Sequence, residues 1–168
     1  MPNFLDIEAS GLHFDAYPIE IALHLDGTIH SWLILPERDW THWSNEAEAL
    51  HGIPRAMLDQ QGVPARQVAI AINELMAESD GLIYSDACAW DEDWINILFN
   101  ASGLSREFHV LPIEDLFDTG DWARFQLILK TLQKENHAGR HRAAADVGMI
   151  YQAWRLTSDS ATEPKTRT

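Results

Sequence analysis

The chain has 168 residues, of which 46% are hydrophobic and 23% are charged. One globular domain is expected, because domains typically hold about 100 to 200 residues, and the composition excludes disordered and fibrous proteins. A single cysteine excludes an intramolecular disulfide, and the N-terminus lacks the basic and apolar segments of a secretory signal, so we expect a cytoplasmic protein. No apolar run reaches the roughly 18 residues of a membrane-spanning helix, so no membrane contact is expected.

Charge is distributed unevenly along the chain, which carries 12 basic and 26 acidic side chains and a net charge of −14. Residues 1–123 hold 4 basic and 22 acidic side chains, whereas residues 124–168 hold 8 basic and 4 acidic ones. Affinity for long duplex nucleic acid comes mostly from cations placed on phosphates, so this chain is not expected to bind it. Any polyanion site should use the C-terminal third, and a short or metal-bridged polyanion stays compatible with the charge.

Three apolar-rich runs predict strands in the N-terminal part. Residues 3–8 are expected as a short buried strand with Phe4, Asp6 and Glu8 on one face. Residues 19–25 and 28–35 are joined by Asp26 and Gly27, a dipeptide that favours a tight hairpin turn. The three runs therefore predict a meander whose second and third strands are antiparallel.

Helices and strands alternate after the meander. Residues 41–58 are rich in Trp and His and then helical in composition. The pattern then predicts a helix over 64–78, a strand over 81–85, a helix over 91–100, a strand over 109–113, and helices over 121–135 and 142–156. The expected class is α/β, a mixed five-stranded sheet made of an antiparallel meander and βα units and flanked by helices. We expect one domain over residues 1–157 and a flexible tail over 158–168.

The first unusual feature is Asp6 and Glu8 inside an apolar strand. A spacing of two puts both carboxylates on one face, where burial of two negative charges is unfavourable unless a cation or a proton neutralises them. Carboxylate oxygens suit a hard divalent ion such as Mg²⁺ or Mn²⁺. Two interpretations stay open at this point: a metal site, or a wet sheet edge that solvates both groups.

The second feature is the spacing between His141 and Asp146. Five positions of one helix turn about 500°, which would leave the two side chains about 140° apart. If residues 139–141 instead form the entry to the helix, Asp146 can point inward while His141 reaches the same place from the loop. The alternative is that both residues lie on an ordinary solvated surface.

The third feature is the acidic segment around Asp91. Trp90 and Trp94 are four residues apart and are expected to share a helical face that packs into the core. That packing would bring Asp91 to the C-terminal end of the sheet. Asp86 competes for the same carboxylate role, and an acidic first helical turn that faces the helix dipole explains Asp91 equally well.

Taken in order, these segments resemble the DEDDh 3′-to-5′ exonuclease superfamily, which includes proofreading exonucleases, RNase T and oligoribonuclease. Residues 4–12 look like its first motif, an Asp-x-Glu followed by small residues and Gly-Leu. The second and third motifs are matched by Trp90-Asp91-x-x-Trp94 and by the His-x4-Asp spacing of His141 and Asp146. Residues 50–53, Leu-His-Gly-Ile, resemble a further signature between the first two motifs. The resemblance covers about residues 3–156 and implies an RNase H-like fold.

The resemblance implies a two-metal hydrolase that releases 5′-mononucleotides from the 3′ end of single-stranded DNA or RNA. Asp6, Glu8 and Asp146 would hold two Mg²⁺ or Mn²⁺ ions, and Asp91 would help through water. His141 would be the general base, because imidazole exchanges protons near neutral pH. The acidic charge of the chain favours short oligonucleotides as substrates.

In this family, residues at the positions of Leu12, His13 and His51 pack against or contact the terminal nucleotides. Arg140 and Arg142 flank the expected general base and could bind phosphates. The sequence departs from the family at Ala9, where Thr is usual, and at residues 86–87, where a His-Asn pair is frequent.

Two other functions stay open. One is a catalytically weak module that binds nucleic acid or works beside a polymerase, and the other is a different metal phosphodiesterase. The Trp-rich segment from Trp32 to Trp43 has three interpretations: core packing, base stacking or a homodimer face.

Overall fold

The computed structural model describes residues 1–136 and 141–161. Its strands are β1 (Asn3–Ala9), β2 (Pro18–Leu25), β3 (Thr28–Leu35), β4 (Val63–Pro64), β5 (Leu82–Ser85) and β6 (His109–Pro112). Its helices are α1 (Asn45–His51), α2 (Arg55–Gln61), α3 (Ala65–Ala77), α4 (Cys88–Ser102), the 3₁₀ helix η1 (Ile113–Leu116), α5 (Thr119–Glu135) and α6 (Ala143–Ala161).

The strands form one mixed sheet in the order β4-β3-β2-β1-β5-β6. The first three strands pair antiparallel, as predicted, and β5 and β6 add in parallel beside β1. The α/β class is confirmed, but the prediction of five strands is one short. The additional strand, β4, has two residues and pairs parallel with β3, so it is too short to show alternation, and its Pro64 indicated only a helix start.

The predicted hairpin turn connects β2 and β3. Asp26 and Gly27 have positive φ angles of 46° and 83°, the conformation that Asp and Gly tolerate in such two-residue loops. Leu25 faces Thr28 across the turn, and the register continues to Glu20 opposite Leu33.

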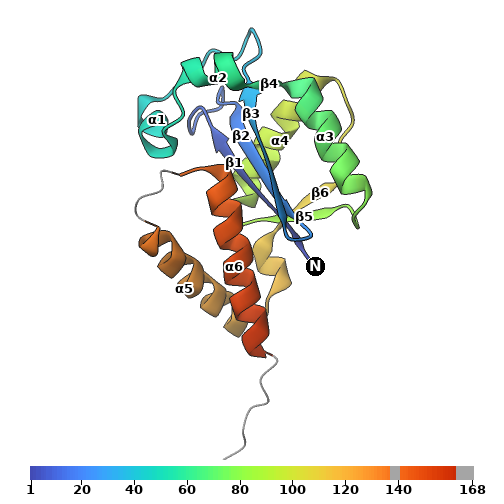
Figure 1. Cartoon of the computed structure of the whole chain (residues 1–168), viewed down its shortest axis with the longest axis vertical. Coiled ribbons are helices and arrows are strands. Elements are labelled where there is room, and N and C mark those ends of the chain that lie inside the picture. Colours follow the sequence, from blue (N-terminus) through green and yellow to red (C-terminus); the bar gives the residue numbers. More distant parts are fainter. Residues whose placement is uncertain (137–140, 162–168) are drawn as a thin grey trace, which may run out of the picture.

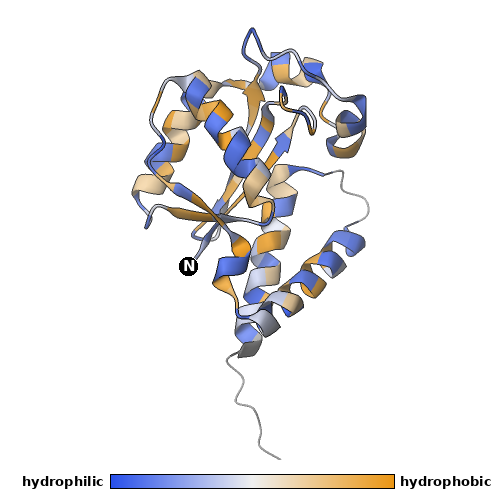
Figure 2. Cartoon of the chain, turned by 180° about the vertical axis from the view of Figure 1, so that it is seen from behind, coloured by the Kyte–Doolittle hydropathy of each residue, from blue (hydrophilic) through white to orange (hydrophobic). Residues whose placement is uncertain are grey.

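Helices cover both faces of the sheet (Figure 1). Leu5 and Ile7 of β1 pack into a core with side chains of α3 and α4, among them Ile72 and Leu98. Phe4, on the opposite face of β1, packs with α5 and α6, including Ile150. Figure 2 shows hydrophobic residues on the central strands and more hydrophilic ones on the outer faces of the helices. Because Asp6 and Glu8 share the face of Phe4, both carboxylates point to the α5 and α6 side.

Several predicted boundaries differ from the structure by a few residues. Helix α6 continues to Ala161, so residues 158–161 of the expected tail are helical, and residues 162–168 lie outside the described part. Thr157 is buried, and its hydroxyl donates to the Ala153 carbonyl at 2.8 Å, so its polar group is satisfied within the helix. Helix α4 begins at Cys88, three residues before the predicted start.

Among the described residues, no helix is both long and apolar enough to cross a membrane.

Candidate active site

The two carboxylates of β1 belong to Asp6, in the middle of the strand, and Glu8, near its C-terminal end. Five of the seven β1 residues are buried, whereas Asp6 and Glu8 are half-buried. Glu8 lies opposite Glu20 of β2, and Asp6 lies opposite Ala22. A wet sheet edge does not describe this place, because β1 is an inner strand with β2 on one side and β5 on the other.

Asp91 joins the β1 carboxylates from the first turn of α4. Its side chain is buried, and its Oδ2 atom accepts a 2.5 Å hydrogen bond from the Ser85 hydroxyl at the end of β5. Its Oδ1 atom is buried and has no hydrogen-bond partner within the described part of the chain. Trp94 is buried beneath it, as predicted, but Trp90 is 46% exposed and does not pack into the core.

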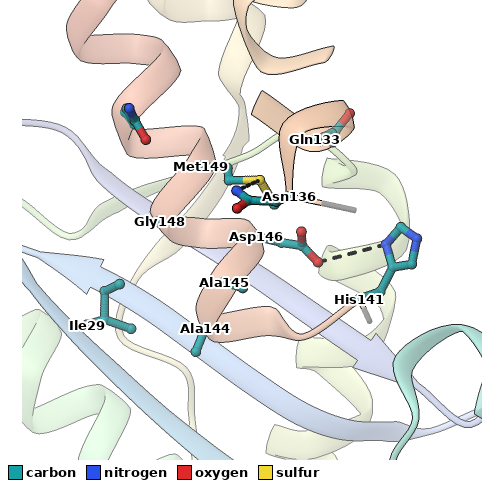
Figure 3. A pocket seen from close by; sticks show the side chains of 10 residues that line it. Ile29, Gln133, Asn136, His141, Ala144, Ala145, Asp146, Gly148 and Met149 are labelled. Atoms are coloured by element: carbon teal, nitrogen blue, oxygen red, sulfur yellow. Dashed lines mark hydrogen bonds and ion pairs between the residues drawn. The ribbon is translucent and has the colours of Figure 1, made fainter. Parts of the chain in front are cut away.

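His141 and Asp146 approach one another as the loop-entry alternative predicts. His141 precedes α6, and Asp146 projects from its first turn toward the imidazole (Figure 3). Their Nδ1 and Oδ2 atoms are 3.9 Å apart, and the His141 side chain is 65% exposed whereas that of Asp146 is 18% exposed. The exposed imidazole therefore faces both solvent and the carboxylates.

Glu20 fixes the start of α6. Its buried carboxylate accepts two hydrogen bonds from Arg142, at 2.9 and 2.6 Å, and a third from the Ala143 backbone N–H at 3.0 Å. A carboxylate at a helix N-terminus also interacts favourably with the helix dipole. Since His141 and Asp146 lie on either side of this contact, Glu20 holds the segment that presents both.

Desolvation and mutual repulsion raise the pKa of each carboxyl in the carboxylate cluster, which consists of Asp6, Glu8, Asp91 and Asp146. Desolvation raises the pKa of Asp6 well above its usual range, and Asp91, Asp146, Asp86 and Glu8 raise it further. Desolvation, followed by Asp146 and Glu20, raises the pKa of Glu8 to about 7. Without a neutralising cation, Glu8 is therefore partly protonated near neutral pH, and the protonated form of Asp6 is favoured as well.

The pKa values of the two helical carboxyls are raised as well. Desolvation raises the pKa of Asp91 to about 8, although the hydrogen bond from Ser85 opposes the change. Desolvation also raises the pKa of Asp146, while His141 opposes it. Carboxylates from three elements thus share one electrostatic environment, which a bound cation would relieve.

The donor set fits a hard divalent ion. One ligand atom each from Glu8, His141 and Asp146 lies within 4.8 Å of the other two. The unpartnered Oδ1 atom of Asp91 and the raised pKa of Asp6 indicate that both carboxyls also lack a neutralising partner in the described protein. A site dominated by carboxylate oxygens suits Mg²⁺ or Mn²⁺ better than softer metals.

A pocket of about 150 Å³ opens beside Glu8. Its walls include Leu12, Leu50, His51 and Trp94, and both leucines are largely exposed, Leu12 by 73%. His51 is buried and its Nδ1 atom accepts a hydrogen bond from the Ile53 N–H at 3.0 Å, so its Nε2 atom carries the proton. That donor is buried and has no hydrogen-bond partner in the described protein.

Gly11 allows the turn that presents Leu12. Its φ of +153° is rare for other residues, and an added Cβ would lie 2.6 Å from the His42 ring. His13, the next candidate, is exposed and stacks on His42 with ring centroids 5.0 Å apart. His13 is not among the residues that line the pocket beside Glu8.

The remaining candidates lie elsewhere. Arg142 is paired with Glu20, so its guanidinium already has an anionic partner, and Arg140 lies outside the described residues. The tryptophans of the 32–43 segment are half-buried and pack against the core, with Trp40 stacked on Tyr17 at 5.1 Å. Core packing therefore accounts for this segment, and a homodimer face stays a prediction.

Glu20 is the main residue that the sequence interpretation missed. It stands between two isoleucines in an apolar run, the same anomaly that singled out Asp6 and Glu8. A search for every acidic residue within an apolar strand would have found it.

No protein-family model matches the chain, and no curated protein matches it in sequence. Solved exonuclease structures are similar to it in fold. Exonuclease I of E. coli in complex with a dA16 oligonucleotide has a TM-score of 0.69 and 18% identity, over 96% of this chain and 43% of that one. Exonuclease I of Methylocaldum szegediense has a TM-score of 0.68 and 15% identity, over 97% of this chain and 41% of that one.

A 3′-exonuclease solved for its recognition of the histone mRNA stem-loop has a TM-score of 0.64 and 17% identity, over 94% of this chain and 63% of that one. The chain spans less than half the length of the two exonuclease I chains. These matches are exonucleases, as the motif resemblance predicts, and at such identities they establish the fold alone. The chain therefore has the α/β fold shared by these exonucleases, consistent with the predicted RNase H-like class.

Proposed function

We propose that this chain is a metal-dependent 3′-to-5′ exonuclease of the DEDDh superfamily that releases 5′-mononucleotides from single-stranded DNA or RNA, short oligonucleotides included. The observation that carries the proposal is the approach of Glu8, His141 and Asp146, whose ligand atoms lie within 4.8 Å of one another, together with the electrostatic coupling of Asp6 and Asp91 to the same carboxyls. The fold shared with solved exonucleases and the four ordered motifs support the same function.

The carboxylates are assigned as ligands of two Mg²⁺ or Mn²⁺ ions, with Asp6, Glu8 and Asp146 as direct ligands and Asp91 as an auxiliary one. Asp91 is preferred to Asp86 because its buried Oδ1 atom has no protein partner, whereas Asp86 is exposed. When bound, a pair of divalent ions stabilises charge on the attacking and leaving oxygens of a phosphoryl displacement.

His141 is assigned as the general base. Its exposed imidazole can reach a water that approaches from solvent, and Asp146, 3.9 Å away, stabilises the imidazolium that forms. Glu20 and Arg142 act as positioning residues, because they hold the first residues of α6 rather than the substrate.

The terminal nucleoside is assigned to the pocket beside Glu8. Leu12 and Leu50 offer apolar surface to a base, and the Nε2–H of His51 offers a hydrogen bond that the described protein leaves unused. The scissile phosphate would then lie at the carboxylates. His13 is assigned a secondary contact at most, since its ring stacks on His42.

The test is a time course with 5′-labelled single-stranded DNA and RNA oligomers, in Mn²⁺, in Mg²⁺ and in chelator. The wild-type protein should give a ladder that shortens from the 3′ end only with metal, and Asp6→Ala and Asp146→Ala should give none. Binding without turnover in any metal would instead favour the nucleic-acid-binding module. Cleavage of a small nucleotide ester but not of oligonucleotides would favour another phosphodiesterase.

A further inference from the structure

A groove with both polar and apolar walls runs along one face of α5, near the carboxylates. A cavity of about 580 Å³ is lined by Asp86 and by residues of α5, among them Trp122, Gln126, Lys130 and Gln133. These four α5 residues follow spacings of four, four and three, so they share one helical face. At 1.5 Å per residue the stripe is about 16 Å long, longer than one nucleotide.

The groove is continuous with the active site through Gln133. The same side chain lines a second cavity, of about 680 Å³, whose walls include Asn136, His141 and Asp146 (Figure 3). Asp86, which also lines the groove, raises the pKa of both Asp6 and Asp91, so it borders the carboxylate cluster. The α5 face therefore begins where the reacting phosphate would lie.

The groove and the nucleoside pocket lie on different sides of the carboxylates. Leu50 and His51, in the walls of the pocket, belong to α1, whereas the groove belongs to α5. In Figures 1 and 2, α1 and α5 lie on opposite sides of the place where α6 begins. The α5 groove therefore offers a path to a strand whose terminal nucleoside occupies the pocket and whose scissile phosphate lies at the carboxylates.

Lys130 is the notable cation of this groove. It is the first lysine of the chain, and five arginines precede it. Three of them are engaged: Arg55 with the Trp40 and Thr41 carbonyls, Arg66 with the Ser102 carbonyl, and Arg106 with Glu92. Lys130 itself is exposed and has no hydrogen-bond or ion-pair partner in the described part of the chain, so its ammonium group is available to an anion.

The other cavity near the nucleoside pocket lacks this character. It measures about 380 Å³ and is lined by His13, Phe14, Trp90 and Asp93, among others, with no lysine or arginine. A lining without lysine or arginine offers phosphates no permanent cation, whereas the α5 groove has Lys130, and lysine and glutamine side chains commonly bind phosphate and sugar groups of nucleic acids.

We propose that the α5 groove, through Lys130, Gln126 and Gln133, binds the sugar-phosphate backbone of nucleotides on the 5′ side of the scissile phosphate. The inference rests on the proposed exonuclease function and adds the path of the substrate. It makes turnover dependent on substrate length, because a dinucleotide ends before the groove is filled. It also explains how a chain of net charge −14 holds a polyanion at all.

The test compares Lys130→Gln with the wild-type protein on a 5′-labelled dinucleotide and octanucleotide of the same base. The variant should raise KM for the octanucleotide roughly 3- to 10-fold and leave KM for the dinucleotide unchanged. The matched control is Lys134→Gln, one turn further along α5 and outside the groove lining, which should change neither value. The slope of log affinity against log salt for the octanucleotide should fall by about 0.7 in Lys130→Gln, as expected for one lost phosphate contact on a single strand.

Equal losses on both substrates, no loss on either, or the same loss in Lys134→Gln would overturn the inference. The Kd for the octanucleotide is measured by fluorescence anisotropy in Ca²⁺. Because this measurement reports binding and not turnover, it tests the groove separately from the proposed exonuclease function. If the wild-type protein hydrolyses nothing, the exonuclease proposal fails, while an unchanged Kd in Lys130→Gln rejects the groove independently.

Discussion

Replacing Glu8 with Gln should stabilise the metal-free protein at alkaline pH. The pKa of Glu8 is raised from 4.5 to about 7, so its stabilising contribution is present below pH 4.5 and is lost as the pH rises through 7. At 1.36 kcal/mol per pH unit, this rise in the pKa of Glu8 lowers the free energy of unfolding by about 3 kcal/mol at pH 8 and by less than about 1 kcal/mol at pH 5. For a chain of this size the Tm should rise by roughly 5 to 10 °C at pH 8.

The measurement is thermal unfolding in chelator at pH 5 and pH 8, for the wild-type protein, Glu8→Gln and the control Glu74→Gln, an exposed residue of α3. The control should change the Tm little at either pH. An equal gain for Glu8→Gln at both pH values, or no gain at pH 8, would refute the argument that an uncompensated buried charge lies at this site.

Three further variants test other parts of the site. Mn²⁺ should raise the Tm of the wild-type protein at pH 8 by several degrees, and Asp146→Asn should remove most of that gain in a thermal shift assay. Glu20→Gln leaves the half-exposed Arg142 without its anionic partner, so denaturant unfolding should show a loss of about 1 to 2 kcal/mol in the free energy of unfolding. The same variant should lower kcat at least tenfold with little change in KM. An unchanged kcat would contradict the positioning role of Glu20. Gly11→Ala should lower the free energy of unfolding by about 1 to 3 kcal/mol in the same experiment, because its Cβ would clash with His42; wild-type stability would show that the loop accepts a side chain.

Much of the fold could be predicted from the sequence because its elements carry strong local signals. The β2–β3 hairpin follows from Asp26 and Gly27, whose positive φ angles only a few residues tolerate. The helix predicted over 142–156 is confirmed as α6, whose Met149, Ile150, Ala153 and Trp154 pack in the core that contains Phe4. Strand β4 was not predictable, because two residues contain no period and their pairing with β3 depends on tertiary contacts.

The candidate site could be predicted in part for a similar reason. Acidic residues in an apolar strand, such as Asp6 and Glu8, are visible in a sequence, and Asp91 is indicated by the tryptophans that flank it. The pairing of Glu20 with Arg142 spans 122 residues, and no local pattern joins them, so Arg142 was expected on phosphates instead. The α5 groove was also missed, because glutamines and a lysine on a helix are typical of any solvated face.

The most direct test of the central claim is the first product released from a single-stranded oligonucleotide labelled at its 3′-terminal nucleotide. With Mn²⁺, the wild-type protein should convert the label to a 5′-mononucleotide from the earliest time point, with no labelled fragment of intermediate length, and Glu8→Gln should release none. Labelled intermediates from internal cleavage, or release that persists in chelator or in Glu8→Gln, would contradict a carboxylate-dependent 3′-to-5′ exonuclease.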